Sequence, residues 1–198
     1  CNIDIVKYLV EQGHADVNVK NEKGQTPLHI ATDKCNIDIV KYLVEQGHAD
    51  VNVKNEKGQT PLHIATDKCN IDIVKYLVEQ CQADVNIKDK NEQTPLHIAT
   101  DKCNIDIVKY LVEQCHADIK TINKTAIIKA TEKEDIEFVK YLVEQCHADV
   151  NLKNENGQTP LHIATDKCNI DIVKYLVEQC HADIKNISRT AIIKATEK

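Results

Sequence analysis

Cysteine and histidine are the residues of this sequence most suited to chemistry, because both bind metals and both take part in nucleophilic catalysis. The 198-residue chain contains nine of each. The cysteines fall into two sets, one before and one after a periodic apolar segment. The first set is Cys1, Cys35, Cys69, Cys103 and Cys168, and the second is Cys81, Cys115, Cys146 and Cys180. This regular spacing spreads the cysteines along the chain instead of gathering them.

The spacing bears on disulfides and on zinc. Neighbouring helices pack about 8–10 Å apart, whereas a disulfide needs Cα atoms within about 7 Å. Structural zinc needs four converging ligands, and dipeptides such as Cys115-His116 recur singly. We therefore expect free thiols, no metal and no cofactor. Free thiols in this number favour a reducing compartment, the cytosol or the nucleus.

Four histidines share one local sequence, Thr-Pro-Leu-His, and they are His29, His63, His97 and His162. No serine or acidic residue recurs beside them as a nucleophile or an orienting group would. The five glycines are isolated from one another, so the sequence has no glycine-rich phosphate loop. We expect that the protein is not an enzyme.

An internal repeat positions all these residues. Residues 1–34 recur unchanged as 35–68 and with small changes as 69–102 and 134–167, while 103–133 and 168–198 are three residues shorter. We number these copies one to six in chain order. In copy two, Asn36 can cap a helix whose apolar residues follow helical spacing, and Thr60-Pro61 begins a second, shorter helix. Between them, Val51–Val53 alternates like extended chain and 55–58 has turn composition.

The four Thr-Pro-Leu-His motifs, with Ile-Val-Lys-Tyr-Leu-Val and Ala-Asp-Val-Asn, resemble ankyrin repeats over the whole chain. A 34-residue period also suits tetratricopeptide repeats, but their Trp, Leu-Gly, Tyr, Ala and Pro pattern is missing. The resemblance implies an all-α solenoid: a stack of helix-turn-helix units joined by β-hairpin-like loops, here called fingers. It also implies that the motif histidines tie the fingers to neighbouring copies. We expect a single domain over residues 1–198 that is a fragment of a longer array.

One departure from the family concerns the turn between the helices. The usual glycine is replaced by Cys35 and its equivalents. Because a side chain disfavours positive φ, we expect a slightly altered turn there.

The resemblance implies a non-catalytic scaffold that binds another protein through the concave face, formed by the finger tips and the exposed side of the shorter helix. Carried over by position, the binding residues of copies two, three and five are Lys54, Glu56, Lys57, Gln59, Asp67, Lys68, Lys88, Lys90, Asn91, Gln93, Asp101, Lys102, Lys153, Glu155, Asn156, Gln158, Asp166 and Lys167. An ordinary solvated charged face would look the same. Two other functions remain open: a regulatory or targeting segment of a larger enzyme or channel, and a mechanical spacer without a specific partner.

The two short copies lose the finger turn, the proline and the histidine, and each carries five basic and four acidic residues. They are either decayed copies or a notch for an acidic partner, near Lys120, Lys124, Lys129, Lys185, Arg189 and Lys194. The chain as a whole has a net charge of −6 with both signs interspersed, which disfavours nucleic-acid binding. No segment is apolar enough to insert into a membrane, and we expect a monomer.

Overall fold

The computed structural model describes residues 2–119 and 125–184. The chain divides into two compact units, an N-terminal unit of residues 1–121 and a C-terminal unit of residues 122–198. The described residues form helices and turns without a β-strand. The all-helical repeat stack predicted from the sequence is therefore confirmed.

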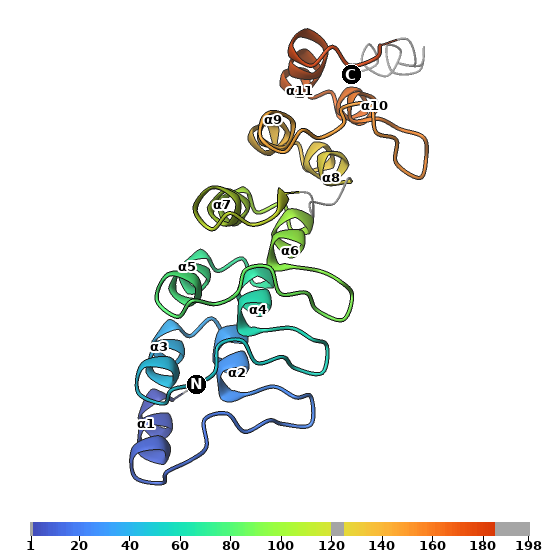
Figure 1. Cartoon of the computed structure of the whole chain (residues 1–198). Helices are drawn as coiled ribbons and strands as arrows, with labels where there is room; N and C mark the ends of the chain where they lie inside the picture. Colours follow the sequence, from blue (N-terminus) through green and yellow to red (C-terminus); the bar gives the residue numbers. More distant parts are fainter. Residues whose placement is uncertain (1, 120–124, 185–198) are drawn as a thin grey trace. The chain divides into compact units, whose positions relative to one another are not determined.

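The N-terminal unit contains two rows of helices (Figure 1). The long helices contact one another in chain order, and so do the short ones. The long row is α1 (Ile3–Glu11), α3 (Ile37–Glu45), α5 (Ile71–Glu79) and α7 (Ile105–Lys109), which continues as the π-type turn η1 (Tyr110–Gln114). The short row is α2 (Pro27–Asp33), α4 (Pro61–Asp67) and α6 (Pro95–Asp101).

The C-terminal unit repeats this arrangement with fewer helices. Its short helices are α8 (Ala126–Glu132) and α10 (Pro160–Asp166). Its long helices are α9 (Ile136–Glu144) and α11 (Ile170–Lys174), the latter continuing as the π-type turn η3 (Tyr175–Gln179). Helix α8 packs on α9 and on α10, and α9 contacts α11.

Helices α3 and α4 begin where their capping residues predict. The Asn36 side chain accepts a hydrogen bond of 3.0 Å from the Ile39 amide at the start of α3. Thr60 precedes α4, and Pro61 occupies the first helical position, where an amide hydrogen is not needed. The predicted helix starts of copy two are therefore confirmed.

Packing between copies, more than the sequence of any one helix, produces the buried core. Helices α1 and α3 have the same sequence. Ile5 and Tyr8 of α1 are 58% and 67% exposed, whereas Ile39 and Tyr42, the equivalent residues of α3, are 4% and 8% exposed. A long helix therefore buries its apolar stripe only where another long helix precedes it.

Polar contacts join each long helix to the next. The Tyr42 hydroxyl donates to Glu11 Oε1 at 3.0 Å, and Lys7 lies 5.9 Å from the centre of the Tyr42 ring. Lys7 and Glu11, four residues apart on α1, therefore both contact the tyrosine of the next copy. The same arrangement recurs for Tyr76 with Lys41 and Glu45, and for Tyr110 with Lys75 and Glu79.

The turn between the helices is not altered by the missing glycine, so that expectation was wrong. Cys35 has a φ of 53°, and Cys69, Cys103 and Cys168 have φ values of 55°, 54° and 59°. The Asn36 amide donates to Ala31 O at 3.0 Å, which is the bond that usually closes a helix around a left-handed glycine. The hydrogen-bonded turn therefore imposes the left-handed conformation on cysteine, at a cost of about 1–2 kcal/mol for each residue.

Candidate partner-binding surface

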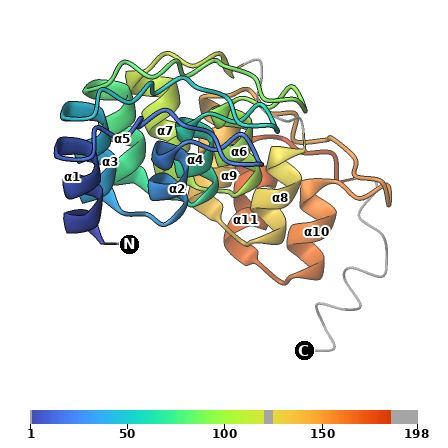
Figure 2. The ribbon, with the colours of Figure 1, turned by 90° about the horizontal axis from the view of Figure 1, so that it is seen from below.

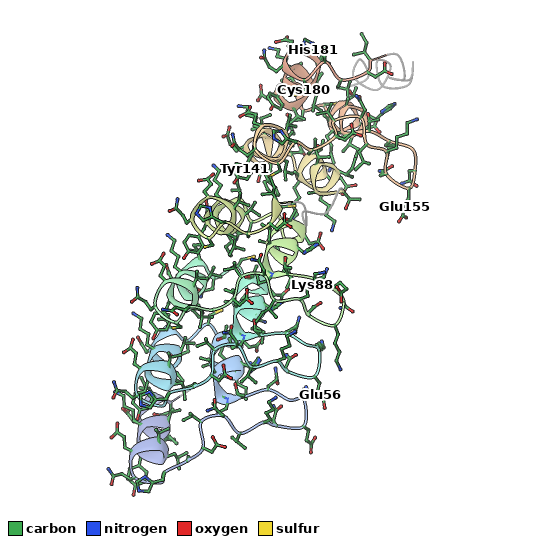
Figure 3. The ribbon with its side chains drawn as sticks, in the orientation of Figure 1. Glu56, Lys88, Tyr141, Glu155, Cys180 and His181 are labelled. Carbon is green, nitrogen blue, oxygen red and sulfur yellow. The ribbon has the colours of Figure 1, made fainter. Side chains whose placement is uncertain are left out.

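The finger turn of copy two is held by the side chain of Asn55. Its Oδ1 accepts hydrogen bonds from the Lys57 amide at 2.9 Å and from the Gln59 amide at 3.0 Å. The Gly58 amide donates to Asn55 O at 2.9 Å, and Gly58 has a φ of 76°. Glu56 and Lys57 therefore lie at the exposed tip of a fixed turn (Figure 3 labels Glu56).

Hydrogen bonds also connect each finger of the N-terminal unit to the next. The Glu56 amide donates to Lys23 O at 3.1 Å, and the Lys90 amide donates to Lys57 O at 3.0 Å. The ammonium group of Lys54 donates to Lys88 O at 2.8 Å. The fingers therefore form a connected row, which Figure 2 shows extending from the helices.

The motif histidines lie under this row. His29 Nδ1 accepts a hydrogen bond of 3.1 Å from the Thr26 amide, so its Nε2 carries the proton and donates to Gln59 O at 3.1 Å. His63 makes the equivalent 3.1 Å bond to Gln93 O. The role that the resemblance implied for the histidines is thus confirmed at these two positions.

Burial decides the protonation state of these histidines. The His29 and His63 side chains are fully buried, and burial lowers the pKa of both, as it also lowers the pKa of His97. The neutral imidazole is the form that accepts from the threonine amide. His29 and His63 therefore serve as structural hydrogen-bonding groups between copies.

Ion pairs line the exposed edge of the short helices. Lys68 Nζ lies 2.9 Å from Asp33 Oδ1, and Lys102 Nζ lies 2.9 Å from Asp67 Oδ1. These side chains are 37–46% exposed, so each pair contributes about 0–1 kcal/mol. Three predicted binding residues, Asp67, Lys68 and Lys102, are therefore partly engaged within the protein.

A groove lies between the fingers and the short helices of the N-terminal unit. It consists of two hollows of about 520 and 350 Å³ that share Gln25, Asp33, Lys57 and Gln59. The first is also lined by Lys23, Asn55 and Glu56, and the second by Ile64 and Asp67. The shared residues make the two hollows one continuous surface, which we call the finger groove.

The structure brings together part of the predicted binding set. Glu56, Lys57, Gln59 and Asp67 line the finger groove. Lys23, Gln25 and Asp33 of copy one line it too; these three residues were not predicted, although copy one is identical to copy two. The other predicted residues of copies two and three line neither hollow, and they are Lys54, Lys68, Lys88, Lys90, Asn91, Gln93, Asp101 and Lys102.

The remaining predicted residues belong to the C-terminal unit or to segments that are not described. Lys153, Glu155 and Asn156 are exposed on the finger of copy five, and Gln158 is half-buried and donates to Asp166 Oδ2 at 3.2 Å. Asp166 and Lys167 are exposed at the C-terminal end of α10. Lys129 is half-buried in α8. Lys120, Lys124, Lys185, Arg189 and Lys194 lie outside the described residues, so the notch remains a prediction.

The cysteines are separate from the finger groove. The eight described cysteines are all free, and no three His, Cys, Asp or Glu residues in the described ranges lie so as to hold a metal ion. Burial raises the pKa of the Cys81, Cys115 and Cys180 thiols, and that of Cys146 to about 11. These four thiols are therefore protonated and poorly nucleophilic near neutral pH.

Within residues 2–119 and 125–184, none of the helices has the length and apolar character needed to cross a bilayer.

Comparison with known proteins identifies the family. A search of curated proteins finds no significant match. A family model described as ankyrin repeats in three copies matches residues 1–89, 47–123, 80–154 and 115–188. These overlapping matches cover residues 1–188 without a gap and agree with the paired helices and projecting fingers. The chain belongs to the ankyrin-repeat family, whose members are typically non-catalytic modules for binding other proteins.

Proposed function

We propose that this protein is a scaffold that binds a partner protein through the finger groove of its N-terminal unit. The observation that carries the proposal is the continuous groove itself, which exposes side chains from two fingers and two short helices. The backbone that carries these side chains is fixed by hydrogen bonds within and between the fingers. A surface that is already ordered loses little conformational entropy on binding, which favours affinity.

The surface between the long helices fits this role less well. Its tyrosine, lysine and glutamate side chains contact one another from copy to copy. Binding a partner there would compete with the contacts that hold the long row together. The exposed finger tips can be contacted without breaking such interactions.

A pair of matched variants tests the proposal. One variant replaces Lys23, Glu56 and Lys57 in the groove by alanine, and the control replaces Gln12, Gln46 and Gln80 by alanine. The control glutamines are exposed and end the long helices. Proteins captured from a cell lysate by the wild type and the control, but lost from the groove variant, support the proposal. Capture that is equal for all three proteins contradicts it.

A second candidate function, a spacer without a specific partner, is favoured by one observation. Copies one and two are identical over 34 residues, including every residue that they contribute to the groove. Selection for a specific partner usually diversifies contact residues, whereas a spacer needs only the scaffold. Failure of the wild type to retain any protein above a bead control would favour the spacer.

A further inference from the structure

The chemistry of the finger groove limits the kind of partner segment that it can hold. Among the described residues that line it, only Ile64 is apolar and none is aromatic. The first hollow is lined by two lysines, one aspartate and one glutamate, so its formal charge is zero. The two aspartates of the second hollow are each paired with a lysine. A neutral polar groove offers little to an apolar or strongly charged partner.

Glutamine side chains are the groups best placed to recognise such a partner. Gln25 and Gln59 line both hollows and occupy the same position in successive copies. Gln25 Oε1 accepts a bond of 3.3 Å from Asn21, and the Gln59 side-chain amide has no hydrogen bond to the described residues. A primary amide both donates and accepts, so each glutamine can pair with a peptide N–H and C=O.

The repeat sets the register of these contacts. Equivalent groups in successive copies recur at the helix packing distance of about 8–10 Å. An extended polypeptide advances about 3.3 Å per residue, so about three residues span one copy. A helix advances about 1.5 Å per residue and keeps its backbone N–H and C=O groups in internal bonds, so its backbone would leave the glutamine amides unused. Recognition of a helix also depends on an apolar groove, whereas the finger groove is polar.

We infer that the finger groove binds an extended, uncharged polar segment of the partner protein, with a hydrogen-bonding side chain at about every third residue. This inference rests on the proposed function and names the partner chemistry of the same groove. Gln25 and Gln59 hold the backbone of the segment. Side chains three residues apart in the segment meet equivalent groups of copies one and two.

Selection from a phage library of random twelve-residue peptides, with the full chain as bait, tests the inference. We expect selected peptides to carry Ser, Thr, Asn or Gln at every third position and few charges. Their affinity, measured by fluorescence anisotropy, should fall by about ten-fold or more in the double variant Gln25→Ala/Gln59→Ala, which removes two hydrogen-bonding groups. The matched control Gln12→Ala/Gln46→Ala has the same 34-residue spacing away from the groove and should bind within about two-fold of wild type.

A synthetic peptide methylated on one backbone nitrogen of the segment should bind about ten-fold more weakly, because it loses a backbone donor. The inference is overturned by peptides with apolar residues at helical spacing, by charged peptides, by no enrichment, or by equal binding to both double variants. Lysate capture that depends on the groove residues, combined with any of these results, would leave the proposed function intact and reject only the extended polar segment.

Discussion

Replacing Gly58 by alanine should destabilise the N-terminal unit by more than the conformation of this residue alone explains. Gly58 has a φ of 76°, and a Cβ there would lie 2.7 Å from the backbone nitrogen of Lys90. The left-handed conformation costs a residue with a side chain about 1–2 kcal/mol, partly offset by about 0.4–1 kcal/mol from the lower entropy of the unfolded chain. The net conformational cost of Gly58→Ala is therefore about 1 kcal/mol.

The close approach adds a second cost. To relieve the contact, the next finger must move, and the bond of 3.0 Å from the Lys90 amide to Lys57 O is then weakened or lost. A net hydrogen bond is worth about 0.5–1.5 kcal/mol, and leaving its groups imperfectly paired costs somewhat more. The expected total for Gly58→Ala is about 2–3 kcal/mol.

Position 92 provides the control within the same unit. Glu92 is the copy-three equivalent of Gly58 and has a φ of 61°, and its carboxylate pairs with Lys88 at 3.0 Å. Glu92→Ala and Glu92→Gly both remove this exposed ion pair. The difference between them therefore isolates the conformational cost, and the glycine variant should be the more stable by about 1 kcal/mol.

Two measurements check the prediction. Urea unfolding followed by circular dichroism compares the alanine-to-glycine step at positions 58 and 92, and hydrogen exchange reports directly on the Lys90 amide. We expect faster exchange of this amide in Gly58→Ala and little change in either position-92 variant. The reasoning would be refuted if the difference in free energy of unfolding between the alanine and glycine proteins were the same at positions 58 and 92 within about 0.5 kcal/mol, with the Lys90 amide still protected. The contact between fingers would then contribute nothing.

Three further predictions concern contacts between copies. Tyr76→Phe should lower the free energy of unfolding by about 0.5–1.5 kcal/mol, because it removes the 3.0 Å hydrogen bond to Glu45. Glu45→Gln should lower it less, because glutamine retains an acceptor for the tyrosine hydroxyl. Urea unfolding of both variants measures the difference. Burial lowers the pKa of His29 and His63, so their contribution to the free energy of unfolding should be complete above about pH 6.5 and lost as the pH falls. Urea unfolding measured from about pH 7.5 to 5 should therefore show a weaker pH dependence of this free energy in the His29→Asn/His63→Asn variant. Cys69→Gly should raise the melting temperature, because it relieves a φ of 55° by about 1 kcal/mol, whereas Cys69→Ala should not.

The sequence predicts the helices of this protein well because their signals are local. Asparagine and Thr-Pro pairs mark the helix starts, and the apolar spacing marks the buried faces. The left-handed turn at Cys35 was not predicted, because local preference argues against it. The conformation is set by the neighbouring residues and not by the side chain of residue 35. Helix α2 ends at Asp33, and the Asn36 amide donates to Ala31 O, which requires a left-handed residue between them.

Contacts between copies are harder to predict, because residues about 30 positions apart must be paired. The bond from Tyr42 to Glu11 spans 31 residues, and the bond from Asp50 N to Asn18 Oδ1 spans 32. Each residue type is visible in the repeat, but its partner depends on the stagger between copies. Lys68, for example, was predicted to bind a partner, but its ammonium group pairs with Asp33 of the preceding copy, a contact that depends on this stagger.

The same dependence on the next copy explains where the repeat departs from its own pattern. A Cβ at Gly24 would lie 2.8 Å from the backbone nitrogen of Glu56 in the next finger, and a Cβ at Gly58 would lie 2.7 Å from that of Lys90. Only glycine fits at these two positions without a shift of the next finger. Copy four lacks the finger sequence, and the residue of copy three at this position is Glu92. Once no full finger follows, the steric reason for glycine disappears and only the smaller conformational cost remains. A side chain can therefore replace glycine next to a short copy, as Glu92 does, although copy five also precedes a short copy and keeps Gly157, where a Cβ would meet no described atom within 4 Å.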